Sequence, residues 1–162
     1  MGIKLLLLAL VSVLVSSIPH TDQMLLTNSL IVGRTEDLLY WICNVCDESN
    51  KPLHSHYIEE NEKDIKCVLS VYPQYTVLAF RYTNTVLNVW QDILYPLQIE
   101  DDNTCKGCKV QKVYNNMWNT IRLNVSNDLR AIQNQVKHTT LYITGISLGG
   151  ALAGLAFVDL RV

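Results

Sequence analysis

The chain has 162 residues, of which 49% are hydrophobic and 17% are charged. This length fits one domain rather than two, and this composition allows a sizeable core and argues against intrinsic disorder. The formal net charge of −2 gives the protein no basic face that would attract phosphate. The balance of charge therefore argues against nucleic acid as a partner.

The N-terminus has the pattern of a secretory signal peptide. Lys4 precedes a largely apolar run over residues 5–15, and two small serines follow it. We expect residues 1–17 to form a signal peptide cleaved after Ser17, and residues 18–162 to form a secreted or lumenal domain. The apolar run is shorter than the roughly 20 residues of a membrane-spanning helix, so no stable membrane span is expected after cleavage. An uncleaved interfacial anchor and a buried helix remain as alternatives.

The cysteines agree with an oxidising compartment. There are two C-x-x-C pairs and one isolated residue, namely Cys43, Cys46, Cys67, Cys105 and Cys108. The gap between the pairs far exceeds the spacing of about 15 to 20 residues in a zinc ribbon, so disulfides are expected and a metal site is not. The segment from Cys105 to Cys108 is typical of a loop closed on itself. Because the count is odd, at least one thiol is free or pairs with a partner outside this chain.

The first half of the chain predicts a hairpin and a short helix. Residues 65–71 and 76–80 are rich in β-forming side chains, and the Tyr-Pro-Gln segment 72–74 between them predicts a tight reversal. Residues 86–94 form a possible helix after the second strand. Residues 29–32 and 38–42 form one apolar stretch, with Glu36 and Asp37 near its middle, that is also expected to be helical.

The clearest element is a helix predicted over residues 114–136. Its apolar side chains recur three and four positions apart and form a stripe along one face. Asn124 begins the only N-x-S/T glycosylation sequon and lies beside the stripe, where a glycan could hinder packing. The stripe consists of Tyr114, Trp118, Ile121, Val125, Leu129, Ile132 and Val136.

A strand and a second helix follow. Residues 141–144 are typical of a short buried strand, and residues 151–160 form a run of small apolar side chains. Helix, strand and helix in this order indicate an α/β fold, with a parallel sheet covered on both faces.

The motif G-x-S-x-G lies between this strand and this helix. Gly145 and Gly149 flank Ser147, and glycine is needed there because the turn from strand to helix is too tight for side chains. Such a nucleophile elbow raises the serine hydroxyl above the sheet. The new helix directs its first amides to the same point, so the backbone N–H of Leu148 is a natural oxyanion donor. A glycine-rich turn with an unrelated serine is the alternative.

The elbow and the segments before it resemble the class 3 (fungal-type) lipases, a branch of the α/β-hydrolases. Residues 77–83 are similar to that family's strand ending in phenylalanine, arginine and a hydroxyl residue. Asn88 and Asp92 fit its lid segment, and residues 105–110 resemble the cysteine pair and basic-apolar step that follow. The resemblance covers about residues 38–160, and its motifs occur in the family's order.

The resemblance implies a partial α/β-hydrolase with a mostly parallel sheet flanked by helices, truncated after the elbow helix. It implies hydrolysis of lipid esters, such as triacylglycerols, through an acyl-enzyme at a lipid–water interface. Neither a cofactor nor a metal is expected.

By the same resemblance Ser147 would be the nucleophile, and Thr83 would give the oxyanion a second backbone N–H beside that of Leu148. Residues 85–94 would form a lid that trades water contact for lipid contact on opening. Core packing is the alternative for the three lid side chains that could touch lipid, which are Leu87, Val89 and Trp90.

The chain also departs from the family. Ile146 stands where the family has histidine, and Tyr82 replaces the glycine before the oxyanion residue. No histidine follows Ser147, and the one later acid, Asp159, is expected to be structural, so a complete Ser-Asp-His triad is absent. Two functions remain: the N-terminal part of a secreted lipase, or an inactive secreted lipid-binding relative or incomplete gene product.

Overall fold

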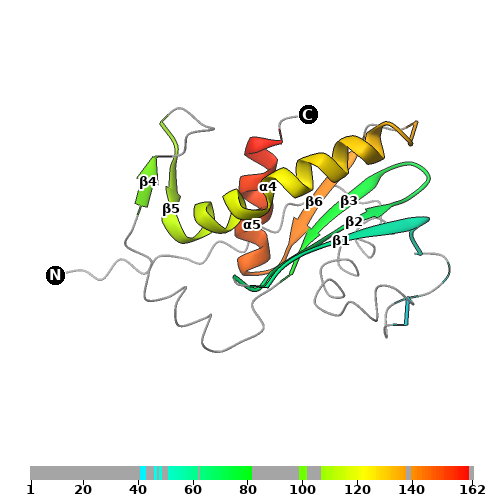
Figure 1. The fold of residues 1–162 in the computed structure, drawn as a ribbon, viewed down its shortest axis with the longest axis horizontal. Helices are drawn as coiled ribbons and strands as arrows, with labels where there is room; N and C mark the ends of the chain where they lie inside the picture. Colours follow the sequence, from blue (N-terminus) through cyan, green and yellow to red (C-terminus); the bar gives the residue numbers. More distant parts are fainter. Residues whose placement is uncertain are drawn as a thin grey trace, which may run out of the picture.

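The computed structural model describes residues 41–42, 46, 48, 51–61, 63–81, 99–101, 107–137 and 140–160. Within them, five strands are followed by a helix, a sixth strand and a second helix (Figure 1). In order, the elements are β1 (His54–Glu60), β2 (Ile65–Val71), β3 (Thr76–Phe80), β4 (Ile99–Asp101), β5 (Lys109–Gln111), α4 (Lys112–Gln133), β6 (Leu141–Gly145) and α5 (Leu148–Asp159).

The main sheet has the strand order β1-β2-β3-β6. The β1–β2 and β2–β3 pairs are antiparallel because short turns join them, and β6 pairs with β3 in parallel because α4 lies between them in the chain. The sheet is therefore mixed, and the described strands do not meet the expectation of a mostly parallel sheet. Strands β4 and β5 form a separate antiparallel pair.

The sequence patterns predicted most of these elements. The strands over residues 65–71 and 76–80 have the predicted bounds, and α4, β6 and α5 lie within a few residues of theirs. Strand β1 was not predicted, because Ile58 is its only buried residue and the apolar alternation of a strand is missing. Of the helical stretch expected over residues 29–42, Trp41 lies in a turn and residues 29–40 lie outside the described residues, as does the possible helix at 86–94.

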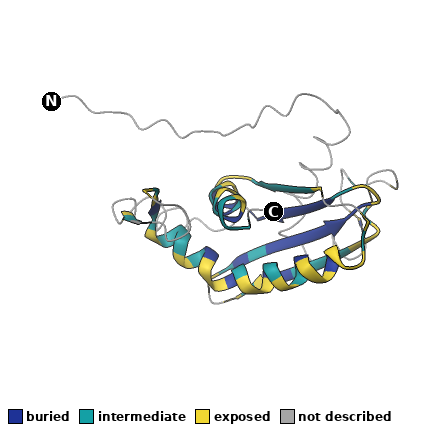
Figure 2. Cartoon of the chain, turned by 90° about the horizontal axis from the view of Figure 1, so that it is seen from above, coloured by how far each residue is buried: buried dark blue, intermediate teal, exposed yellow. Residues whose placement is uncertain are grey.

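One hydrophobic cluster joins both helices to the same face of the sheet. The stripe on α4 points inward, with Ile121 and Val125 almost fully buried, and Figure 2 shows the outer side of this helix exposed. Leu152 and Ala156 of α5 complete the cluster. Helices on both faces were expected, but α4 and α5 share one face.

The opposite face of the sheet carries a smaller, more aromatic cluster. Val68, Val77 and Ala79 pack there with the buried rings of Trp41 and Tyr72. The central strands β2 and β3 are therefore buried on both faces, which explains why apolar residues in them face both sides of the sheet.

A polar contact fixes the two helices to each other. The indole N–H of Trp118 on α4 donates to Oδ2 of Asp159 at 2.9 Å, and the Arg122 guanidinium lies 3.9 Å from the same oxygen. Asp159 thus has the structural role expected from the sequence, at the C-terminal end of α5.

The three described cysteines fall into two groups. Cys67 is free and fully buried in β2, and burial raises the pKa of its thiol far above the ordinary value. Cys46 and Cys108 are disulfide-bonded. The predicted pairing of Cys108 with Cys105 stays a prediction, because Cys105 lies outside the described residues.

The described part of the chain contains no helix that is both long and apolar enough to cross a membrane. The predicted signal peptide, residues 1–17, lies outside this part.

Candidate active site

Ser147 lies in the turn between β6 and α5 with its residue exposed. Its backbone has φ 56° and ψ −121°, and it is one of three described non-glycine residues with positive φ. Such a conformation costs on the order of 1 to 3 kcal/mol and persists only where the surrounding structure enforces it. The predicted nucleophile is therefore held in a strained turn outside any regular element.

The two glycines of the motif are required by close backbone contacts. A Cβ on Gly145 would overlap the carbonyl group of Gly149 and lie 2.8 Å from the amide nitrogen of Gly150. A Cβ on Gly149 would overlap the carbonyl oxygen of Phe80 and lie 2.7 Å from that of Arg81. The elbow is thus packed directly against the end of β3. At both glycine positions there is room only for the Cα hydrogen and not for a Cβ.

The amides after Ser147 are arranged as the motif predicts. The Gly149 N–H donates to the carbonyl of Ile146 at 3.0 Å, and the Gly150 N–H donates to that of Ser147 at 2.9 Å. Leu148 is the first residue of α5, where an N–H has no acceptor within the helix. Among the described residues, no carbonyl outside the helix accepts from it either, so this N–H is available to a developing oxyanion.

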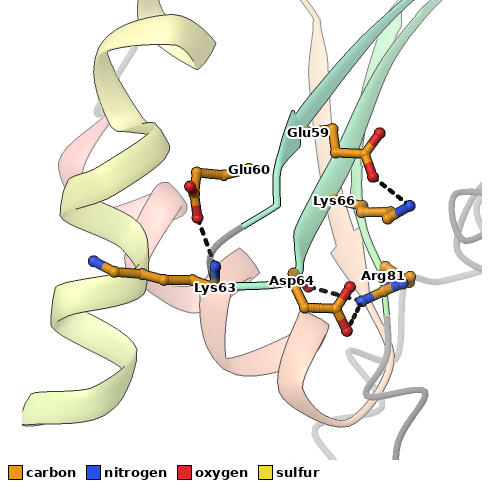
Figure 3. A network of polar contacts seen from close by, with 6 residues as sticks. All are labelled: Glu59, Glu60, Lys63, Asp64, Lys66 and Arg81. Carbon is orange, nitrogen blue, oxygen red and sulfur yellow. Dashed lines mark hydrogen bonds and ion pairs between the residues drawn. The ribbon is translucent and has the colours of Figure 1, made fainter.

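Arg81 anchors the end of β3 on the side away from the elbow. Its guanidinium Nη2 donates to the carbonyl oxygen of Asp64 at 2.7 Å and lies 2.5 Å from Oδ2 of the same residue (Figure 3). The backbone N–H of Arg81 also donates to the carbonyl of Lys66 at 3.0 Å. With Arg81 only 7% exposed, these contacts fix the two carbonyls on which Gly149 rests.

The turn between β1 and β2 has further polar contacts (Figure 3). The Lys63 N–H donates to Oε2 of Glu60 at 2.8 Å, and the Lys66 ammonium lies 2.5 Å from Oε1 of Glu59. The hydrogen bond that the Lys66 ammonium donates to the Glu59 carboxylate raises the pKa of Lys66. The turn that holds Asp64 is therefore itself well ordered by its neighbours.

The described histidines cannot serve Ser147 as a general base. His54 and His56 lie on β1, three strand spacings from β6, or about 14 Å across the sheet. The pairing of strands also places His56 level with Ile143, four residues before Ser147 and roughly 13 Å away along the strand. Both offsets far exceed a hydrogen bond.

Asp159 is also remote from Ser147. Asp159 is the last of the 12 residues of α5, which begins directly after Ser147, so the two lie roughly 18 Å apart along the helix axis. Because its carboxylate accepts a hydrogen bond from the indole of Trp118, Asp159 is not placed to orient a catalytic histidine.

The structure thus brings together the predicted elbow residues Gly145, Ser147, Leu148 and Gly149. The other predicted site residues, Thr83, Leu87, Val89 and Trp90, lie outside the described residues. The role of Asp64 could not be predicted from the sequence, since nothing in a single turn residue indicates a partner 17 positions later.

The family of the chain follows from comparison with known proteins. A family model described as "Lipase (class 3)" matches residues 77–162, which is more than half of the chain and includes the elbow. The chain belongs to the class 3 lipase family. No curated protein matches its sequence.

Solved lipase structures share the fold. A native Rhizomucor miehei lipase propeptide complex has 20% identity and a TM-score of 0.73, with 87% of this chain and 45% of that chain covered. A lipase from Rhizopus microsporus var. chinensis has 19% identity and a TM-score of 0.71, with 88% and 51% covered. A triacylglycerol lipase from Penicillium expansum has 14% identity and a TM-score of 0.63, with 87% and 55% covered. The chain spans about half the length of these structures.

The close contact at Gly149 predicts a large effect of one methyl group. Gly149→Ala should lower the free energy of unfolding by about 3 kcal/mol, because its Cβ would overlap a backbone carbonyl of β3. Gly154→Ala on the same helix is the matched control, since nothing lies within 4 Å of its Cβ, and it should stabilise by about 0.5 to 1 kcal/mol. Urea unfolding measures both; equal effects of the two substitutions would contradict the packing described.

The Arg81–Asp64 pair predicts a second effect. Asp64→Asn keeps a residue type that tolerates positive φ but removes the charge beside a buried guanidinium, and it should cost about 2 kcal/mol of unfolding free energy. Glu48→Gln, which removes an exposed ion pair with Lys51, should change stability by less than about 0.5 kcal/mol. Thermal or urea unfolding of the two variants gives the comparison. A loss at Asp64 no larger than that at Glu48 would show that the pair does not anchor β3.

Proposed function

We propose that this chain carries the nucleophile of a secreted lipase that hydrolyses acylglycerol esters. The strained backbone of Ser147, between two glycines that admit no side chain, is the observation that supports this most strongly. An ordinary turn gains nothing from such strain, whereas a serine nucleophile gains exposure and a nearby oxyanion donor. Family membership supports the same conclusion.

In this proposal Ser147 Oγ attacks the ester carbonyl carbon, its proton passes to a general base, and the alcohol leaves with that proton. Water then hydrolyses the acyl-enzyme and releases the fatty acid. The Leu148 N–H donates to the oxyanion in both steps, with the backbone N–H of Thr83 as the second donor. No cofactor or metal takes part.

Triacylglycerols are the proposed substrates, because one of the similar structures is a triacylglycerol lipase. Residues 85–94 would form the lid, and opening would place Leu87, Val89 and Trp90 against the lipid surface. Residues 1–17 would direct secretion, and disulfides including Cys105–Cys108 would form in the oxidising compartment.

A second candidate is an inactive secreted lipid-binding relative. The described histidines, His54 and His56 on β1, are far from the elbow. Within the described residues, Ser147 therefore has no histidine within hydrogen-bond reach to serve as its base. An elbow without such a base retains the nucleophile and the oxyanion donor, but its hydroxyl is poorly activated.

A fluorophosphonate probe with imidazole separates the two candidates. If Ser147 is a nucleophile that lacks its base, the native chain should be labelled slowly, at one site per chain, and added imidazole should accelerate labelling by replacing the missing general base. Mass spectrometry of the labelled peptide identifies the site.

Two controls define the background: Ser147→Ala, and the wild-type chain unfolded in urea. Imidazole should leave labelling of both unchanged, since neither combines the hydroxyl with a formed oxyanion site. If native labelling at Ser147 never exceeds that of the unfolded chain, the lipid-binding alternative holds and the hydrolase proposal is wrong.

A further inference from the structure

We propose that Asn124, on the outer face of α4, is an acceptor site for an N-linked glycan. The inference rests on the secretion proposed above, because glycans of this type are added in the secretory pathway. It concerns a surface remote from the elbow and does not depend on catalysis.

The sequon Asn124-Val125-Ser126 supplies the chemical requirement. The acceptor is the side-chain amide nitrogen of Asn124. It displaces the pyrophosphate of a lipid-linked oligosaccharide from the anomeric carbon of the first sugar, so that one C–N bond forms and one C–O bond breaks. The amide proton leaves with the reaction, and the lipid pyrophosphate is the leaving group.

The structure removes the objection that a glycan would disturb the core. Val125, in the middle of the sequon, is 0% exposed and packs against the sheet. Asn124 precedes it by one residue and is therefore rotated by about 100° around the helix axis. It is exposed, like most of the outer side of α4 in Figure 2.

The neighbours of Asn124 also leave space for a sugar. Thr120, four residues before it, and Asn127, three residues after it, are both exposed, and the Thr120 hydroxyl accepts a hydrogen bond from the ammonium of the exposed Lys63. Leu123, directly before it, is 67% exposed. A glycan at Asn124 would cover this isolated apolar side chain, which is a gain in solubility that an unmodified helix lacks.

To test this, the full chain is expressed in a eukaryotic secretory host in two forms. One form has its own N-terminus, and the other has an additional cleavable secretion leader in front of residue 1. We expect treatment with peptide N-glycosidase F to increase the gel mobility of the secreted protein by the amount that corresponds to the loss of one glycan. The same enzyme should convert Asn124 to aspartate, which mass spectrometry detects.

Asn124→Gln and Ser126→Ala should each abolish the shift, and Asn127→Gln is the matched control because it removes an exposed asparagine of the same helix outside the sequon. Far-UV circular dichroism checks that the variants are folded. A secreted chain that is insensitive to the glycosidase, or whose shift survives Asn124→Gln, overturns the site. A chain glycosylated at Asn124 only when the added leader is present supports the site and contradicts the proposed secretion by residues 1–17.

Discussion

The contact between the backbones of two distant segments determines the geometry of this protein's candidate site. Gly149 at the start of α5 rests on the carbonyl groups of Phe80 and Arg81 at the end of β3, and Gly145 rests on Gly149 in turn. No side chain fits at either position. The parallel pairing of Phe80 with Gly145 brings the two segments to the same level of the sheet, so the strained conformation of Ser147 follows from sheet register together with helix packing.

The rest of the described structure holds the two sides of that contact. On one side, Arg81 ties the end of β3 to the turn at Asp64. On the other side, Leu152 and Ala156 bury α5 against the sheet and α4. The hydrogen bond from Trp118 to Asp159 fixes the C-terminal end of α5. Burial of large apolar side chains stabilises by about 1.5 to 3 kcal/mol each, which is enough to offset a strained residue.

Sequence patterns were sufficient to predict the elements whose residues form a clear motif, stripe or β-forming run. The β-forming runs of β2 and β3, the α4 stripe and the G-x-S-x-G turn all lie where they were predicted. Strand β1 was missed because an edge strand with one buried residue has no pattern to detect. The mixed sheet and the placement of both helices on one face were also missed, because they depend on connection lengths and crossover handedness rather than on any single segment. The anchoring of Arg81 by Asp64 is likewise a tertiary contact.

The most direct measurement is an experimental structure of the elbow, by crystallography or by NMR of the folded chain. We expect a positive φ at Ser147, an exposed hydroxyl, and Gly149 in contact with the carbonyl oxygens of Phe80 and Arg81. A Ser147 with the dihedral angles of a regular strand or helix, or a Gly149 separated from β3 by a side chain or solvent, would contradict it.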